Sequence, residues 1–255
     1  MACLAVLLLA GAGVMALGAV GHMLAFPRGA RASVPPRPAS ATSPAIDWRA
    51  VGTSVQGRPI LIATFGSGGR HVLVIGGIHG SEFGADVAEQ FAAWLEANPA
   101  AVPAGTRVDI IGCANPDGRA AAQKGNADRV NLNGNFPTRN WKRQKYRSTT
   151  AGPRPASEPE TQALVRVLDG GYVRVVSLHS QGGFVDYDGP NGAELARQVA
   201  SASGMPVKKL GPATMYAGSL GTYVPERYGV PVLTIELSTR VMTPAVLSGL
   251  LASVR

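Results

Sequence analysis

Five short apolar runs constrain the fold of this chain more than any other feature of its sequence. They are rich in β-branched residues and nearly continuous, as strands covered on both faces of a sheet are expected to be. The runs are residues 61–65 (LIATF), 71–77 (HVLVIGG), 108–113 (VDIIGC), 173–179 (VRVVSLH) and 231–237 (PVLTIEL). Each is short enough to be a strand rather than a helix.

Segments with helical spacing of apolar residues lie between these runs. Residues 81–99 end at a proline, residues 192–204 form a further candidate, and residues 157–171 end in glycine. Ser157 and Glu160 have the spacing of a capping box, which predicts that this helix begins at Ser157. Strands that alternate with helices predict an α/β fold, with a mixed, mostly parallel central sheet flanked by helices on both faces.

Composition favours one folded domain and excludes some classes of partner. The 255 residues are 45% hydrophobic, which is enough for one sizeable core, and we expect a monomer. The net charge is +8, but no concentrated basic patch with groove-reading residues is visible, so no nucleic-acid partner is expected. We interpret the basic stretch 139–147 (RNWKRQKYR) as a solvated loop, with contact to anionic glycans or teichoic acids as the alternative.

The N-terminal region predicts export from the cytoplasm. Residues 1–26 contain no Lys, Arg, Asp or Glu, and about 20 apolar residues suffice to span a bilayer. Ala30-Arg31-Ala32 resembles a signal-peptidase site, so residues 1–32 are predicted to be a cleaved signal peptide or an N-terminal membrane anchor. Four prolines make residues 33–46 an extended linker, and residues 47–255 form the folded domain. Both interpretations of the leader place that domain outside the cytoplasm, as a secreted, periplasmic or cell-wall-associated protein.

Polar side chains follow or end four of the predicted strands. They are His79, Asn115, Asp117, His179 and Glu236. Because ligands gather at the carboxyl ends of strands in α/β sheets, we expect these groups to meet at one edge of the sheet.

Two histidines and a glutamate from this set fit a metal site. A catalytic zinc ion commonly has three protein ligands, two of them close together in the sequence and the third distant. His79, Glu82 and His179 have that arrangement, and glycines at 76, 77 and 80 allow a tight turn beside the first two. Glu236 lies inside an apolar run, where a carboxylate is costly without a role, and it is the candidate general base.

Six motifs together resemble the zinc carboxypeptidase family, over residues 71–237. They are HGSE (79–82), NPDG (115–118), NLNGNFP (131–137), SEPET (157–161), SLHS (177–180) and TIEL (234–237). Within that family the bacterial murein peptide amidases are the most similar group, through residues 135–142, 156–164 and 217–224. Those enzymes cut the γ-D-glutamyl–diaminopimelate bond of cell-wall peptides.

The resemblance implies a sheet of about eight strands and a metallopeptidase acting on a peptide or muropeptide. It implies one zinc ion held by His79, Glu82 and His179. It also implies that metal-activated water attacks the scissile carbonyl while Glu236 serves as the general base. These assignments agree with the interpretation of the residues themselves.

The chain departs from the family on the substrate side. The usual motif DLNRNFP is NLNGNFP here, so Asn131 replaces an aspartate and Gly134 replaces an arginine. That arginine, with Asn133 beside it, holds the terminal carboxylate of the substrate in the family, and its planar fork suits this task. A second family arginine, which stabilises the carbonyl oxygen as charge develops, aligns with Lys124.

Two further residues are candidates for substrate binding. Arg129 stands where the family usually has glycine, and one hypothesis is that it reaches into the pocket and replaces the missing arginine; a solvated loop arginine is the alternative. Tyr216 lies about two positions from the place of a family tyrosine near the pocket.

Two other functions compete with the peptidase. An N-acyl amino acid deacylase of the succinylglutamate desuccinylase and aspartoacylase type shares the HxxE motif and a later histidine, although NPDG and NFP favour the peptidase. A non-catalytic cell-wall binding protein is the third hypothesis, because Gly134 and Lys124 alter the substrate clamp; Glu236 argues against it.

Overall fold

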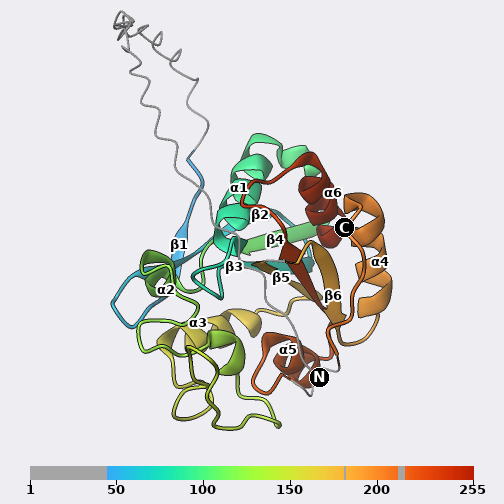
Figure 1. Ribbon diagram of the computed structural model, residues 1–255. Helices are drawn as coiled ribbons and strands as arrows, with labels where there is room; N and C mark the ends of the chain where they lie inside the picture. Colours follow the sequence, from blue (N-terminus) through green and yellow to red (C-terminus); the bar gives the residue numbers. More distant parts are fainter. Residues whose placement is uncertain (1–44, 181, 212–215) are drawn as a thin grey trace, which may run out of the picture. The chain divides into compact units, whose positions relative to one another are not determined.

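The structure is a computed structural model, and it describes residues 45–180, 182–211 and 216–255 (Figure 1). The predicted signal peptide or anchor, residues 1–32, and all but the last two residues of the predicted linker lie outside this range. In the described part, no helix is both long and apolar enough to cross a membrane.

A seven-stranded mixed sheet forms the centre of the described domain. Its strands lie in the order β1-β2-β4-β3-β5-β7-β6. Their bounds are β1 Arg49–Thr53, β2 Pro59–Gly66, β3 Arg70–Gly76, β4 Thr106–Ile111, β5 Arg174–Ser180, β6 Phe184–Asp188 and β7 Val232–Leu237. The four central strands are parallel to one another, whereas β1, β2 and β6 add antiparallel pairs at the two edges. The predicted mixed sheet is confirmed, with seven described strands where about eight were expected.

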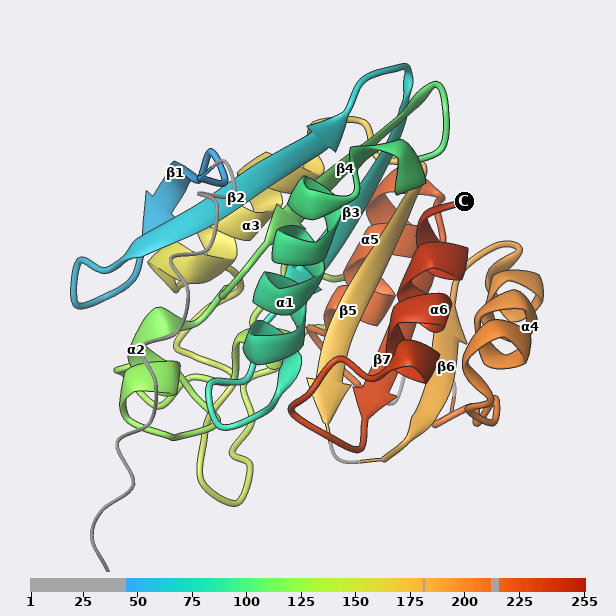
Figure 2. The same ribbon diagram turned by 90° about the horizontal axis from the view of Figure 1, so that it is seen from above.

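Helices cover both faces of the sheet, as predicted. Their bounds are α1 Gly84–Ala97, α2 Pro116–Ala120, α3 Pro159–Leu168, α4 Gly192–Ser203, α5 Leu220–Tyr228 and α6 Pro244–Val254, with short 3-10 turns at Pro99–Ala101 and Leu132–Gly134. Helices α1, α4 and α6 pack on one face, and α3 and α5 pack on the other (Figure 2).

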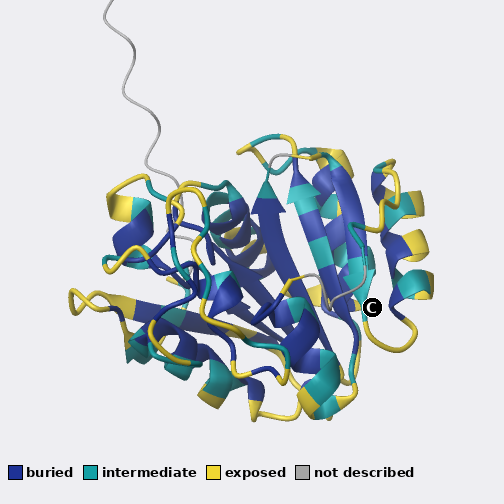
Figure 3. Cartoon of the chain, turned by 60° about the horizontal axis from the view of Figure 1, so that its bottom comes forward, coloured by how far each residue is buried: buried dark blue, intermediate teal, exposed yellow. Residues whose placement is uncertain are grey.

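The central strands are buried on both sides, and this explains their continuous apolar sequence. In β3, Val72 and Val74 belong to the core under α1, while Leu73 and Ile75 belong to the core over α3. Burial is concentrated in the strands, and exposed residues gather in the loops and on the outer helix faces (Figure 3). No residue of the edge strand β1 is fully buried, and the edge strand β6 carries two aspartates. The periodicity of the sequence did not reveal these two strands.

The predicted capping box at residues 157–160 is not formed. Helix α3 begins at Pro159, whose fixed backbone angle and missing N–H suit the first helical position. The Ser157 hydroxyl donates to Glu158 Oε1 at 2.6 Å, while Glu160 Oε1 accepts from the Val55 N–H at 3.1 Å. The Ser157 hydroxyl also accepts from Asn135 Nδ2 at 2.9 Å, so other hydrogen bonds use both side chains that would have closed the local cap.

The start of α1 lies directly against the end of β5. A Cβ atom on Gly84 would lie 2.0 Å from the Leu178 carbonyl oxygen, so only glycine permits this approach. The contact is reinforced because the Phe83 N–H donates to Ser180 Oγ at 3.3 Å. This packing brings Glu82, two positions before the first residue of the helix, to the carboxyl end of β5.

Replacing Gly84 with alanine tests this close approach. The added methyl group must push α1 away from the β5 backbone, and overpacking of this kind costs about 1–3 kcal/mol of unfolding free energy. Urea unfolding followed by circular dichroism measures the loss. Gly69→Ala is the matched control, because no atom lies within 4 Å of its added Cβ; equal stability of the two variants would contradict the packing argument.

Candidate metal centre

The carboxyl ends of three adjacent parallel strands bring the candidate residues together. His79 lies in the turn after β3, His179 lies near the end of β5, and Glu236 is its register partner on β7. Gly77 adopts a left-handed φ of 63° at the start of the turn. A Cβ atom on Gly80 would lie 2.1 Å from the Gly118 carbonyl carbon, so the turn also packs closely against α2.

His79, Glu82 and His179 converge on one point. Their ligand atoms all lie within 4.8 Å of one another. The Glu82 carboxylate lies between the rings, with Oε1 2.8 Å from His79 Nδ1 and Oε2 3.0 Å from His179 Nδ1. The Ser180 N–H also donates to Glu82 Oε2, at 3.3 Å, and fixes the carboxylate from the β5 side.

Asn131 sets the tautomer of His79. Asn131 Oδ1 accepts a hydrogen bond from the Asn133 N–H at 3.1 Å, so this atom is the amide oxygen. It also lies 2.8 Å from His79 Nε2, which must therefore carry the hydrogen. Burial lowers the pKa of His79 below its ordinary value, which favours the neutral ring. In that tautomer Nδ1 carries a lone pair that faces the cluster.

This donor set fits a cation. Burial by itself raises the pKa of Glu82, but the contacts with His179 and His79 hold that pKa well below its usual range, so the carboxylate is ionised. A lone pair on His79 Nδ1 and an ionised oxygen 2.8 Å away repel each other unless positive charge lies between them. Two imidazole nitrogens and one carboxylate are the ligands of many catalytic zinc sites, and Asn131 would orient the first of them.

A cavity of about 350 Å³ opens beside these three residues. Glu236 lines it and is half-buried, and its carboxylate has no hydrogen-bond or ion-pair partner among the described residues. Burial raises the pKa of Glu236, as suits a group that exchanges protons near neutral pH. Lys124, Asn133 and Tyr216 also line the cavity, and the Tyr216 hydroxyl donates to the Leu210 carbonyl oxygen at 3.2 Å.

Asn115 and Asp117, which were expected at the same edge of the sheet, do not line this cavity. Of the residues predicted to catalyse or to bind metal or substrate, Arg129 alone does not line it. It lies on the exposed loop after α2 and lines a neighbouring cavity of about 370 Å³ with Lys124 and Arg147. Its φ of 57° is in the left-handed region, which explains why the family usually places glycine there. Its exposed position outside the cavity of the metal residues agrees with the alternative of a solvated loop arginine.

An acidic pair in the cavity wall was missed from the sequence. Asp186 and Asp188, which alternate along β6, both line the cavity. Lys209 bridges them, with Nζ 3.1 Å from Asp186 Oδ1 and 2.9 Å from Asp188 Oδ1. Burial raises the pKa of Asp188 against the opposing effect of Lys209. The alternation of residue types in FVDYD was the available sequence signal. It indicates a strand, but it does not predict that this strand lies beside the metal residues.

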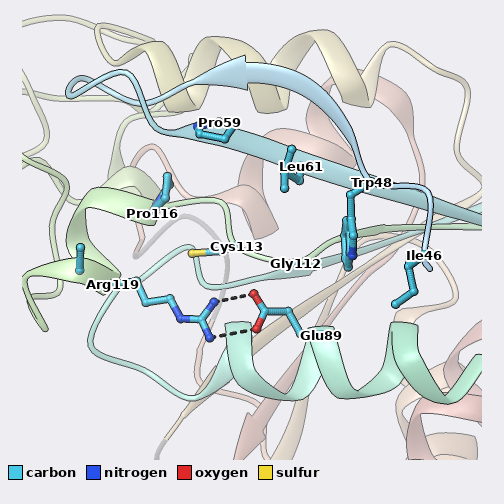
Figure 4. Close-up of a pocket in the computed structure, with 10 residues that line it drawn as sticks. Ile46, Trp48, Pro59, Leu61, Glu89, Gly112, Cys113, Pro116 and Arg119 are labelled. Carbon is cyan, nitrogen blue, oxygen red and sulfur yellow. Dashed lines mark hydrogen bonds and ion pairs between the residues drawn. The ribbon is translucent and has the colours of Figure 1, made fainter. Parts of the chain in front are cut away.

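A larger cavity of about 650 Å³ is lined by different residues (Figure 4). Its walls include Trp48, Leu61 and Cys113, and the Glu89 carboxylate and the Arg119 guanidinium face each other across one side as an ion pair. Of the described residues, only His79, Glu82 and His179 form a cluster able to hold a metal ion. The chemistry of the side chains, rather than the size of the cavity, therefore locates the candidate site.

Comparison with known proteins gives a consistent family. The profile described as zinc carboxypeptidase matches residues 39–208. Murein peptide amidase A of Escherichia coli K12 is 31% identical over 170 residues, which cover 61% of this chain and 67% of the relative. The protein of the same name from Vibrio campbellii is 33% identical over 202 residues, or 73% of this chain and 77% of the relative.

Solved structures extend the likeness to the fold. The murein-tripeptide amidase MpaA from Escherichia coli O157 has a TM-score of 0.68 and 25% identity, covering 83% of this chain and 92% of its own. Bovine thrombin-activatable fibrinolysis inhibitor has a TM-score of 0.67 at 15% identity, covering 82% of this chain and 88% of its own, and shares the fold.

The role of Asn131 is testable by its effect on zinc affinity. Asn131→Leu removes the acceptor of the His79 Nε2–H, and loss of such a partner is expected to weaken zinc binding about 10- to 100-fold. Competition with a chromophoric chelator measures the affinity. Asn131→Asp keeps an oxygen at the same place and should retain the affinity; a leucine variant that binds zinc like the wild type would refute the assignment.

Proposed function

Because the chain belongs to the zinc carboxypeptidase family, we propose that it hydrolyses a peptide or isopeptide bond in peptidoglycan stem peptides. The convergence of His79, Glu82 and His179 beside the unpartnered carboxylate of Glu236 carries this proposal. The relatives are named murein peptide amidases, and the motif resemblance to that group supports the γ-D-glutamyl–diaminopimelate bond as the substrate bond.

His79 through Nδ1, Glu82 through its carboxylate and His179 through Nδ1 would hold the ion. Zinc bound there supplies a Lewis acid that lowers the pKa of water and polarises a carbonyl group. The buried hydrogen bond from His79 Nε2 to Asn131 keeps the first ligand in the required tautomer.

Glu236 is the group that moves the proton. Its carboxylate takes a proton from the attacking water as the new C–O bond forms, and it returns that proton to the amine nitrogen as the C–N bond breaks. A raised pKa suits both steps, since the group must accept and release the proton near neutral pH. Lys124, at the edge of the same cavity, would stabilise negative charge on the carbonyl oxygen.

We further propose an extracytoplasmic monomer, since stem peptides lie outside the cytoplasm and the sequence of residues 1–32 predicts export or anchoring. Family membership favours the peptidase or amidase over the deacylase of the second hypothesis. Family membership also favours the peptidase or amidase over the non-catalytic binding protein, because a protein that only binds its ligand has no use for a half-buried base.

Glu236→Gln isolates the proton-transfer role. Glutamine keeps the size of the side chain but cannot accept the proton, so kcat should fall about 10²- to 10⁴-fold while KM changes little. Steady-state hydrolysis of a muropeptide and zinc content by mass spectrometry are measured together. Glu194→Gln, on the exposed surface of α4, is the control, and activity in Glu236→Gln close to that of this control would exclude Glu236 as the base.

Metal removal combined with a substrate panel separates the three functions. Residues 47–255 are incubated with muropeptides or with N-acyl amino acids, with and without a chelator, and the products are identified by mass spectrometry. We expect cleavage of muropeptides that the chelator abolishes and added zinc restores. Cleavage confined to N-acyl amino acids would establish the deacylase, and a zinc-loaded protein without turnover would establish the binding protein.

A further inference from the structure

Tyr146 occupies the space beside Gly134 in the wall of the cavity. A Cβ atom on Gly134 would lie 2.6 Å from the Tyr146 hydroxyl oxygen and 3.3 Å from two of its ring carbons. No larger residue at position 134 therefore fits while the tyrosine is in place. The two positions form one unit, in which the absence of a side chain on one makes room for the phenol of the other.

The Tyr146 hydroxyl is available as a neutral donor. It accepts a hydrogen bond from Gln144 Nε2, and no described residue accepts the proton of the hydroxyl itself. Burial raises the pKa of Tyr146 above its ordinary value, so the phenol stays protonated at neutral pH. The oxygen is thus held by Gln144 while the O–H bond is free to point at a ligand in the cavity.

Asn133 supplies a second neutral donor in the same cavity. Its Oδ1 accepts from the Leu220 N–H at 2.8 Å, which fixes the orientation of the amide. The NH₂ group of this side chain donates to no residue in the described ranges. In both residues the acceptor atom is satisfied by the protein, and the donor remains for an oxygen of the substrate.

The charges around these donors do not favour a carboxylate. Among the residues that the structure describes, no arginine lines the cavity, and the one lysine that does, Lys124, acts electrostatically on His79 and Glu236. Asp186 and Asp188 add two carboxylates to the wall, bridged by a single lysine. A free carboxylate next to the scissile amine of the substrate would therefore gain little electrostatic attraction from the side chains that line the cavity.

We propose that Tyr146 and Asn133 form a neutral oxygen-binding wall that accepts an amide or peptide carbonyl as readily as a free carboxylate. The inference rests on the proposed function, because it concerns the group that follows the scissile bond. It predicts that this hydrolase cleaves stem peptides whose diaminopimelate carboxyl next to the scissile amine is amidated or extended, and not only those that end in a free acid.

The test compares L-Ala-γ-D-Glu-diaminopimelate with the same tripeptide amidated at that carboxyl. For the zinc-loaded protein, kcat/KM for the two substrates should agree within about fivefold, since neutral donors distinguish the two oxygens only weakly. Tyr146→Phe should raise KM for both by a similar factor of about tenfold, with a smaller effect on kcat. Tyr228→Phe, whose hydroxyl bonds Asp169 and which does not line the cavity, is the matched control.

A double variant of Gly134 and Tyr146 tests whether a preference for the free carboxylate can be introduced. Tyr146→Ala removes the obstacle, and Gly134→Arg in that background supplies a guanidinium, so the preference should shift at least about tenfold toward the free acid. A wild-type preference for the free acid that Tyr146→Phe leaves unchanged would overturn the inference.

Binding separates this inference from the proposed function. Calorimetric titration of the metal-free protein with the acid and the amide should give similar affinities, both reduced in Tyr146→Phe. If the zinc-loaded protein shows this binding pattern but no turnover, the proposed hydrolase function is overturned and the proposed oxygen-binding wall is supported. If the protein cleaves the free acid alone and does not bind the amide, the proposed hydrolase function is supported and the proposed oxygen-binding wall is overturned.

Discussion

The hydrogen bond from His79 Nε2 to Asn131 Oδ1 is the interaction on which the chemistry of this site depends. Imidazole has two nitrogens, and only the one without a hydrogen can bind a metal ion. Asn131 is itself fixed by the Asn133 N–H, so its oxygen cannot be exchanged with its nitrogen without losing that bond. The backbone after α2 thus decides which atom of a histidine after β3 faces the cluster.

The fold contributes position rather than chemistry. Strands β3, β5 and β7 are adjacent and parallel, so residues at their carboxyl ends meet although they are far apart in the sequence. The glycines at 80 and 84 allow the connecting turn and the start of α1 to press against neighbouring backbone. With these close approaches, Glu82 reaches from the turn to the end of β5 and bridges the two imidazoles.

The sequence predicted what is repetitive or motif-like and missed what depends on three-dimensional contacts. Continuous apolar runs identified the central strands because these are covered on both faces, whereas the edge strand β6, with two aspartates among its five residues, carried no such signal. The three candidate ligands were found because their residue types are unusual at strand ends. Asn131 was noted only as a departure, since its partner is 52 positions away, and the left-handed backbone of Arg129 leaves no signal in the sequence pattern.

The departures of this chain from the family motifs lie at more than one place in the site. Gly134 packs against Tyr146, which lines the cavity, whereas Asn131 contacts His79 and Lys124 acts electrostatically on His79 and Glu236. A half-buried carboxylate without a hydrogen-bond partner in the described structure costs folding free energy, so Glu236 has no stabilising role that would explain its presence. A protein that only bound its ligand would be more stable with a neutral residue there. The carboxylate of Glu236 beside the three candidate metal ligands therefore favours a hydrolase over a protein that only binds its ligand.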